Sequence, residues 1–134
     1  MTDYAFETDV QVRYADRDTL GHVNNAVFAT FLEEARIAYY REVLGLSLTD
    51  HSLVVANLTI DFERPVEADE VTVGTGVEAV GGTSFTMGYE VAAEGETAAT
   101  GETVMVTLDR STGQPQPVPD RWREAFEAAG AVER

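Results

Sequence analysis

The chain contains no cysteine and no lysine. Without cysteine it can form no disulfide, no thiolate nucleophile and no cysteine-ligated metal site. Its only two histidines are His22 and His51, which argues against a zinc site built from several histidines. We therefore expect a protein whose chemistry uses no metal.

Long apolar runs are also missing. No stretch approaches the ~20 apolar residues that a membrane-spanning helix requires. The first residues, MTDYAFETDVQV, lack the basic and apolar regions of a signal peptide. These absences predict a cytoplasmic protein that does not bind membranes.

Positive charge is scarce as well. All 9 basic residues are arginines, and they face 24 acidic residues, so that the formal net charge is −15. This charge repels phosphate and argues against nucleic acid or an anionic membrane as a partner. The acids are spread along the chain, which is typical of a surface adapted to high salt, where repulsion is screened. A halophilic source is our hypothesis, and an ordinary acidic cytosolic protein is the alternative.

The length of 134 residues and an apolar content of 44% suit a single domain spanning residues 1–134. Alternating apolar residues predict five strands, at Glu7–Tyr14, Val54–Pro65, Val71–Val77, Phe85–Val91 and Thr97–Asp109. A long helix is predicted from Asn24 or Asn25 to about Leu44, because apolar residues recur there at helical spacing. A short helix over Arg121–Ala129, capped by Asp120, follows a proline-rich stretch.

One strand, one long helix and four antiparallel strands make an α+β domain. A single long helix cannot cover both faces of such a sheet. The segment Ser52–Arg64 is long and apolar on one face, and an exposed strand of this kind invites pairing. We therefore expect it to contact a second subunit, most simply in a two-fold dimer.

The polar loop before the long helix carries the most chemistry. A helix start presents unpaired N–H groups and positive potential, which stabilise a developing oxyanion. Asp18 lies close enough upstream to attack there or to activate water, although an aspartate in a loop equally often caps a turn. Asp16 is expected to bond Arg13 or backbone amides and to shape the loop.

The order of elements and several motifs resemble those of the hotdog-fold acyl-CoA thioesterases, in particular the 4-hydroxybenzoyl-CoA thioesterase-like group. The shared motifs are RYADRD at residues 13–18, GHVNN at 21–25, FLEEAR at 31–36, DFERPV at 61–66 and TSF at 83–85. This resemblance implies a five-stranded antiparallel sheet wrapped around one long central helix. It also implies homodimers or homotetramers, with active sites at the dimer interface near the helix N-terminus.

The resemblance also assigns roles. The substrate would be an acyl-CoA, hydrolysed without any cofactor other than the CoA of the substrate itself. Asp18 would be the nucleophile or general base, and the backbone N–H of Asn25 would polarise the thioester carbonyl.

Four further residues are predicted to contact the substrate: Gly21, His22, Asn24 and Ser84. Each of the first three has a plainer structural interpretation: a turn for Gly21, a backbone-bonded loop residue for His22 and a cap for Asn24. Some relatives carry basic residues at the turn before Ser84, where this chain has Gly81-Gly82-Thr83 and offers only backbone amides to a phosphate. Glu33 on the helix is a weaker candidate.

The sequence is also compatible with two other functions. One is a dehydratase acting on 3-hydroxyacyl thioesters, which would need a histidine base paired with an acid. The other is a hotdog module that binds acyl-CoA without turnover.

Overall fold

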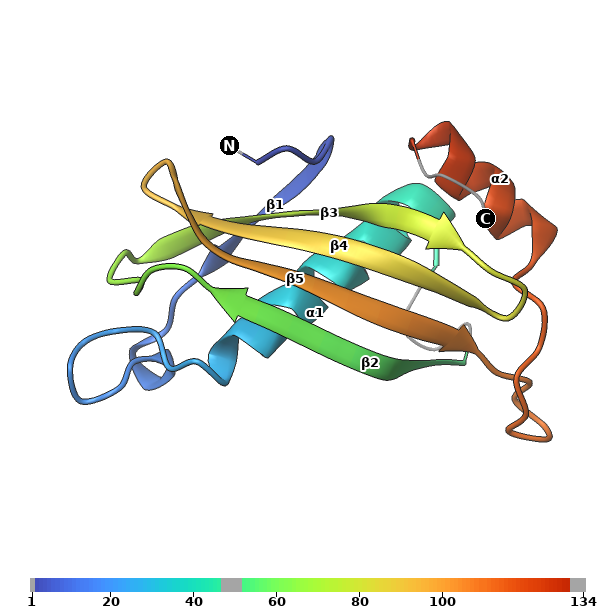
Figure 1. The fold of residues 1–134 in the computed structure, drawn as a ribbon, viewed down its shortest axis with the longest axis horizontal. Coiled ribbons are helices and arrows are strands. Elements are labelled where there is room, and N and C mark those ends of the chain that lie inside the picture. Colours follow the sequence, from blue (N-terminus) through green and yellow to red (C-terminus); the bar gives the residue numbers. More distant parts are fainter. Residues whose placement is uncertain (1, 47–51, 131–134) are drawn as a thin grey trace.

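The computed structural model describes residues 2–46 and 52–130 (Figure 1). Five antiparallel strands form one sheet in the order β1-β3-β4-β5-β2. They are β1 (Phe6–Gln11), β2 (Leu53–Phe62), β3 (Glu70–Val80), β4 (Ser84–Ala93) and β5 (Glu96–Thr107). The helices are α1 (Val27–Tyr39), continued by the π-helical turn η2 (Tyr40–Leu44), and α2 (Asp120–Ala128); η1 (Tyr14–Asp16) is a short 3₁₀ turn.

Helix α1 lies diagonally across one face of the sheet, as Figure 1 shows. Its predicted apolar stripe is fully buried there and consists of Phe28, Phe31, Leu32, Ala35 and Tyr39. The sheet approaches the helix so closely at Gly101 that a Cβ atom there would overlap the side chain of Leu32. The helix ends at Gly45, whose φ of 66° is the left-handed conformation that glycine favours. The predicted sheet wrapped around one long helix is therefore confirmed.

The first strand is shorter than its apolar pattern predicts. It ends at Gln11, because the carboxylate of Asp16 accepts a hydrogen bond from the backbone N–H of Arg13 at 2.8 Å and turns the chain into η1. Tyr14 was expected to alternate with Val10 and Val12 in the strand. Its side chain instead lies in η1 and is 93% exposed, so this part of the prediction was wrong.

Helix α1 also begins slightly later than predicted. The side-chain oxygen of Asn24 accepts a hydrogen bond from the N–H of Ala26 at 2.9 Å. Its backbone oxygen accepts one from Val27 at 2.9 Å. Asn24 therefore organises the turn that leads into the helix, and the regular helix starts at Val27.

Strand β2 is an edge of the sheet and carries exposed apolar side chains. Val54, Val55, Leu58 and Phe62 are each 44–47% exposed. The predicted strand is present, yet these four residues are not covered by the rest of the described chain. No helix among the described residues is long and apolar enough to cross a membrane.

Candidate active site

The loop between β1 and α1 folds back on itself as a small hairpin. Arg17 and Val23 form an isolated antiparallel bridge. Within it, the N–H of Asp18 donates to the backbone oxygen of His22 at 2.7 Å, and the N–H of Gly21 donates to that of Asp18 at 3.1 Å. Gly21 has a φ of 83°, which a residue with a side chain rarely adopts. The predicted role of Gly21 in a turn is confirmed.

The carboxylate of Asp18 is engaged on one side only. Its Oδ1 atom accepts hydrogen bonds from the backbone N–H of Leu20 at 2.9 Å and of His22 at 3.1 Å. Among the described residues, no hydrogen bond reaches Oδ2. The turn-capping interpretation of Asp18 thus holds for one oxygen and leaves the other available for chemistry.

One backbone N–H group at the start of α1 has no hydrogen-bond acceptor among the described residues. The N–H groups of Ala26 and Val27 are taken by Asn24, and that of Phe28 donates to the oxygen of Asn25 at 3.3 Å. The N–H of Asn25 itself has no partner within the described chain. It is therefore the backbone donor that a ligand at this helix start would meet.

Asp18 and Asn25 line the same cleft, which has a volume of about 300 Å³. Its opposite wall is the end of β2 and the following residues, from Phe62 to Pro65. Phe28 closes the inner side, and its ring meets that of Phe62 edge to face with centroids 5.2 Å apart. The cleft is thus polar beside the loop and aromatic beneath, and it lies at the exposed edge of the sheet.

His22 lines this cleft and pairs with a residue that the sequence did not indicate. Its Nε2 atom lies 3.2 Å from Oε2 of Glu67. Glu67 lies 45 residues further along the chain, where no local pattern points to it. His51, the other histidine, lies outside the described residues.

Asp16 has the structural role that the sequence predicts. It is buried, and its carboxylate accepts hydrogen bonds from the backbone and the guanidinium of Arg13. These bonds hold the pKa of the Asp16 carboxyl below its usual range. Its backbone oxygen accepts the N–H of Asn24 at 2.8 Å, so Asp16 ties the two ends of the loop together.

Ser84 lies apart from this cleft within one subunit. It pairs with Val106 on β5, whereas Phe62 pairs with Ala99. Those two partners are seven residues apart on the strand, roughly 23 Å at the rise of a β-strand. The structure therefore brings together Asp18, His22 and Asn25 but leaves Ser84 near the opposite end of the sheet.

Two arginines lie at the places considered for a phosphate, Arg64 at the cleft and Arg123 at the Gly81-Gly82 turn. Arg64 lines the cleft, but its guanidinium donates to the backbone oxygen of Thr97 at 3.0 Å and pairs with Glu96 at 3.3 Å. Beside the Gly81-Gly82 turn, Arg123 of α2 donates to both glycine carbonyls, at 2.6 and 3.1 Å. The sequence did not indicate this second cation, because α2 reaches the turn only in the folded chain.

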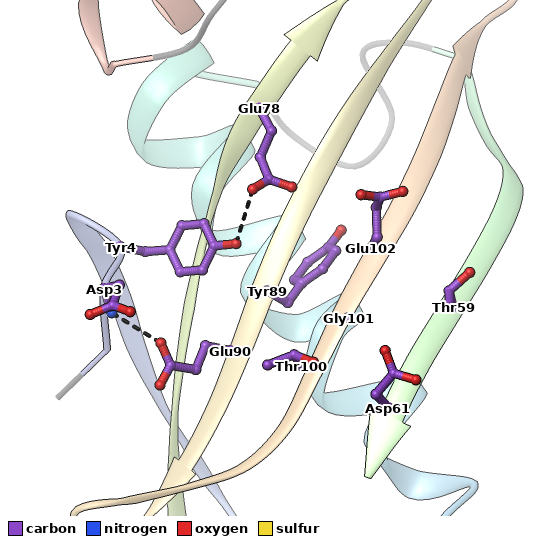
Figure 2. Close-up of a pocket in the computed structure, with 10 residues that line it drawn as sticks. All are labelled: Asp3, Tyr4, Thr59, Asp61, Glu78, Tyr89, Glu90, Thr100, Gly101 and Glu102. Atoms are coloured by element: carbon purple, nitrogen blue, oxygen red, sulfur yellow. Dashed lines mark hydrogen bonds between the residues drawn. The ribbon is translucent and has the colours of Figure 1, made fainter. Parts of the chain in front are cut away.

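A second concavity lies on the sheet face away from α1 and is lined largely by acids (Figure 2). Glu78 and Glu90 lie beside Tyr4 there, and Glu102 lies further across the sheet on β5. Burial and the neighbouring Glu78 carboxylate raise the pKa of Tyr4 to about 12. So much negative charge would repel the phosphates of a nucleotide, so this concavity is a poor candidate for CoA.

Among the described residues, no group of three potential ligands is arranged to hold a metal ion.

Comparison with known proteins identifies the family. The model of the thioesterase-like superfamily matches residues 12–126. The chain belongs to this superfamily. The match includes the Asp18 loop, all of α1 and most of the sheet.

Individual relatives are thioester hydrolases. A thioesterase from Thermus thermophilus, solved in complex with coenzyme A and Zn, is 40% identical, with a TM-score of 0.85 and 96% of each chain covered. The long-chain acyl-CoA thioesterase FadM of Escherichia coli is 29% identical over 127 residues, which cover 90% of this chain and 96% of FadM. A 1,4-dihydroxy-2-naphthoyl-CoA hydrolase from Synechococcus elongatus is 26% identical over 134 residues, covering 92% of this chain and 95% of that protein.

Proposed function

We propose that this thioesterase-superfamily protein hydrolyses an acyl-CoA thioester to a free acid and CoA. The observation that carries the proposal is the shared cleft of about 300 Å³, which Asp18 and Asn25 both line. The similarity to proteins named as acyl-CoA hydrolases supports the same reaction.

The chemistry follows from the two groups. The thioester carbonyl oxygen accepts a hydrogen bond from the Asn25 N–H, and the helix N-terminus stabilises the negative charge that develops on it. Asp18 Oδ2 then attacks the carbonyl carbon, or removes a proton from a water molecule that attacks it. In the first route CoA leaves as a thiolate and water hydrolyses the resulting anhydride. In the second route water adds directly, and both routes give the same acid and CoA.

The complete site requires a second subunit in our proposal. The cleft opens beside β2, whose edge and apolar side chains are exposed in one chain. A homodimer, or a homotetramer built from dimers, would cover these residues and shield the cleft from bulk solvent. Contacts of Gly21, His22, Asn24 and Ser84 with substrate stay predictions. Ser84 would reach the same substrate only along the extended CoA or from the partner subunit.

The proposal is tested by measuring thiol release from a panel of acyl-CoA esters, at low salt and in multimolar KCl. Wild type is compared with Asp18→Asn and Asp18→Ala, and all three are checked for folding and oligomeric mass. Turnover in wild type that is lost in both variants supports the assignment. Folded wild type that binds acyl-CoA but releases no thiol from any ester would instead indicate the binding module.

A second candidate function rests on the His22–Glu67 pair. A histidine base beside a carboxylate is what a 3-hydroxyacyl thioester dehydratase needs, and His22 lines the cleft. Formation of an enoyl thioester from a 3-hydroxyacyl-CoA, followed by its ultraviolet absorbance, distinguishes this reaction from hydrolysis. A His22→Gln variant should abolish dehydration in that case, whereas hydrolysis would still depend on Asp18.

A further inference from the structure

The hydrogen bonds inside the loop that carries Asp18 set its shape, but they do not fix its position against the rest of the fold. Its tip is solvent-exposed and includes Leu20, which is 77% exposed. The hairpin of residues 17–23 has only a short ladder of backbone bonds. Segments with few buried contacts open locally at low cost, so a defined position for Asp18 requires support from outside the loop.

Arg17, the residue directly before Asp18, supplies such support. Its guanidinium donates to the backbone oxygens of Gly21 at 3.2 Å, Glu67 at 2.9 Å and Ala68 at 3.0 Å. It also donates to Oδ1 of Asp69 at 2.9 Å. The side chain of Arg17 is 19% exposed, whereas that of Asp69 is 98% exposed. The guanidinium is therefore largely covered by the two segments, and its bond to Asp69 is on the solvent side.

The four acceptors belong to two segments that are distant in sequence. One is the loop itself, through Gly21, and the other is the connection from β2 to β3, at residues 67–69. The planar guanidinium presents its donors in a fixed fork, so one side chain fixes the distance and the orientation between both segments. The N–H of Val23, which donates to the oxygen of Val66 at 2.9 Å, and the His22–Glu67 pair join the same two segments.

We propose that Arg17 is a positioning residue for Asp18: it clamps the loop to the β2–β3 connection and so holds the carboxylate in the cleft with the Asn25 N–H. The role in turnover rests on the proposed function, whereas the clamp itself does not. A misplacement of about 1 Å can cost roughly 100-fold in rate. Loss of the clamp should therefore lower kcat about 10- to 100-fold while KM changes little.

The test compares Arg17→Met and Arg17→Lys with a matched charge removal, Arg41→Met, at an exposed position on η2. Arg17→Met should lose kcat, and Arg17→Lys should recover only part of it, because an ammonium cannot reach both segments with a planar fork. Arg41→Met should keep the kcat of wild type. An Arg17→Met protein with the full kcat of an active wild type overturns the proposal.

A double-mutant cycle separates positioning from general destabilisation. If Arg17 acts through Asp18, Arg17→Met should cause no further loss of rate in an Asp18→Ala background. An equal fold-loss in both backgrounds would overturn the proposal, because the arginine would then be acting without Asp18.

Hydrogen exchange tests the clamp without any substrate. In wild type the amides of Asp18, Gly21 and Val23 are hydrogen-bonded, and in Arg17→Met they should exchange at least several-fold faster, with no such change in Arg41→Met. Unchanged exchange would overturn the clamp even if wild type proves to hydrolyse thioesters. Faster exchange in a protein without thioesterase activity would support the clamp and reject only the proposed function.

Discussion

Oδ1 of Asp18 accepts a hydrogen bond from the backbone N–H of His22 at 3.1 Å. The residue to which we assign the chemistry therefore also holds its own loop in shape. Substitutions at this position combine two effects, and a suitable pair of variants separates them.

Asp18→Asn should remove activity with little loss of stability. The asparagine carbonyl oxygen can still accept the two backbone N–H groups, but the side chain has no negative charge. We expect kcat to fall by about 10²–10⁴-fold, the usual contribution of a general base, with a nearly unchanged free energy of unfolding. Asp18→Ala should lose activity and, in addition, about 1 kcal/mol of stability as the hydrogen bonds are lost. Urea unfolding and kcat measured on both variants check this, and full activity in Asp18→Asn would contradict it.

Asp16 should make the stability of the protein depend on acid pH. Hydrogen bonds from Arg13 lower the pKa of Asp16 from its ordinary value of 3.8. The folded state therefore holds this proton less tightly than the unfolded state. The resulting stabilisation is present above about pH 4 and is lost as the pH falls through the lower, folded-state pKa.

The matching variant is Asp16→Asn. It should be less stable than wild type at neutral pH, with a difference in unfolding free energy that shrinks at acid pH. Asp109→Asn is the control, because Ser111 likewise lowers the pKa of Asp109, but in a turn away from the cleft. Both variants should show the pH effect in denaturant melts, and only Asp16→Asn should also lower kcat. A stability difference for Asp16→Asn that is constant from pH 7 to pH 2 would reject the assignment.

The periodicity of apolar residues correctly predicted which side chains of a single helix are buried. The stripe from Phe28 to Tyr39 faces the sheet as its spacing predicts, because a helix repeats every 3.6 residues whatever surrounds it. Tyr14 fits the alternating pattern of the first strand equally well, but a hydrogen bond from Arg13 to Asp16 ends the strand first. The alternating pattern reflects hydrophobicity alone, so it cannot show that a side chain will bind a backbone N–H and end the strand.

The long-range contacts of the candidate site could not be predicted from local sequence patterns. Arg17 reaches residues 67–69, and His22 reaches Glu67, each across 45 or more positions of chain. Each contact exists only because α1 and the sheet bring the loop beside the β2–β3 connection. Asp18 and Asn25 could be proposed from sequence since both lie in the motif before the helix, whereas the contacts that hold the loop to the β2–β3 connection could not.

Strand β2 should form a subunit interface, and Leu58 tests it. This side chain is 45% exposed, and burying a leucine contributes about 1.5–3 kcal/mol. Leu58→Glu should therefore weaken dimerisation by at least about 10-fold in the dissociation constant. Sedimentation at several protein concentrations measures this shift, and thiol release should fall as monomer accumulates. Tyr14→Glu, at an exposed aromatic residue outside β2, should keep the mass of wild type. A monomeric wild type, or a Leu58→Glu protein of unchanged mass, would contradict the interface.

Salt should stabilise the protein. The acidic concavity in Figure 2 should contribute a measurable part of this effect. Glu78, Glu90 and Glu102 line this one concavity, and the net charge of −15 adds repulsion over the whole surface. The screening length falls from about 30 Å at 0.01 M salt to about 3 Å at 1 M. The melting temperature should therefore rise with KCl. Glu102→Gln should be more stable than wild type at low salt, and its melting temperature should rise less with KCl. Glu124→Gln on α2 should reduce this salt-dependent rise less than Glu102→Gln does. Equal melting temperatures of wild type at low and multimolar KCl would remove the support for a halophilic source.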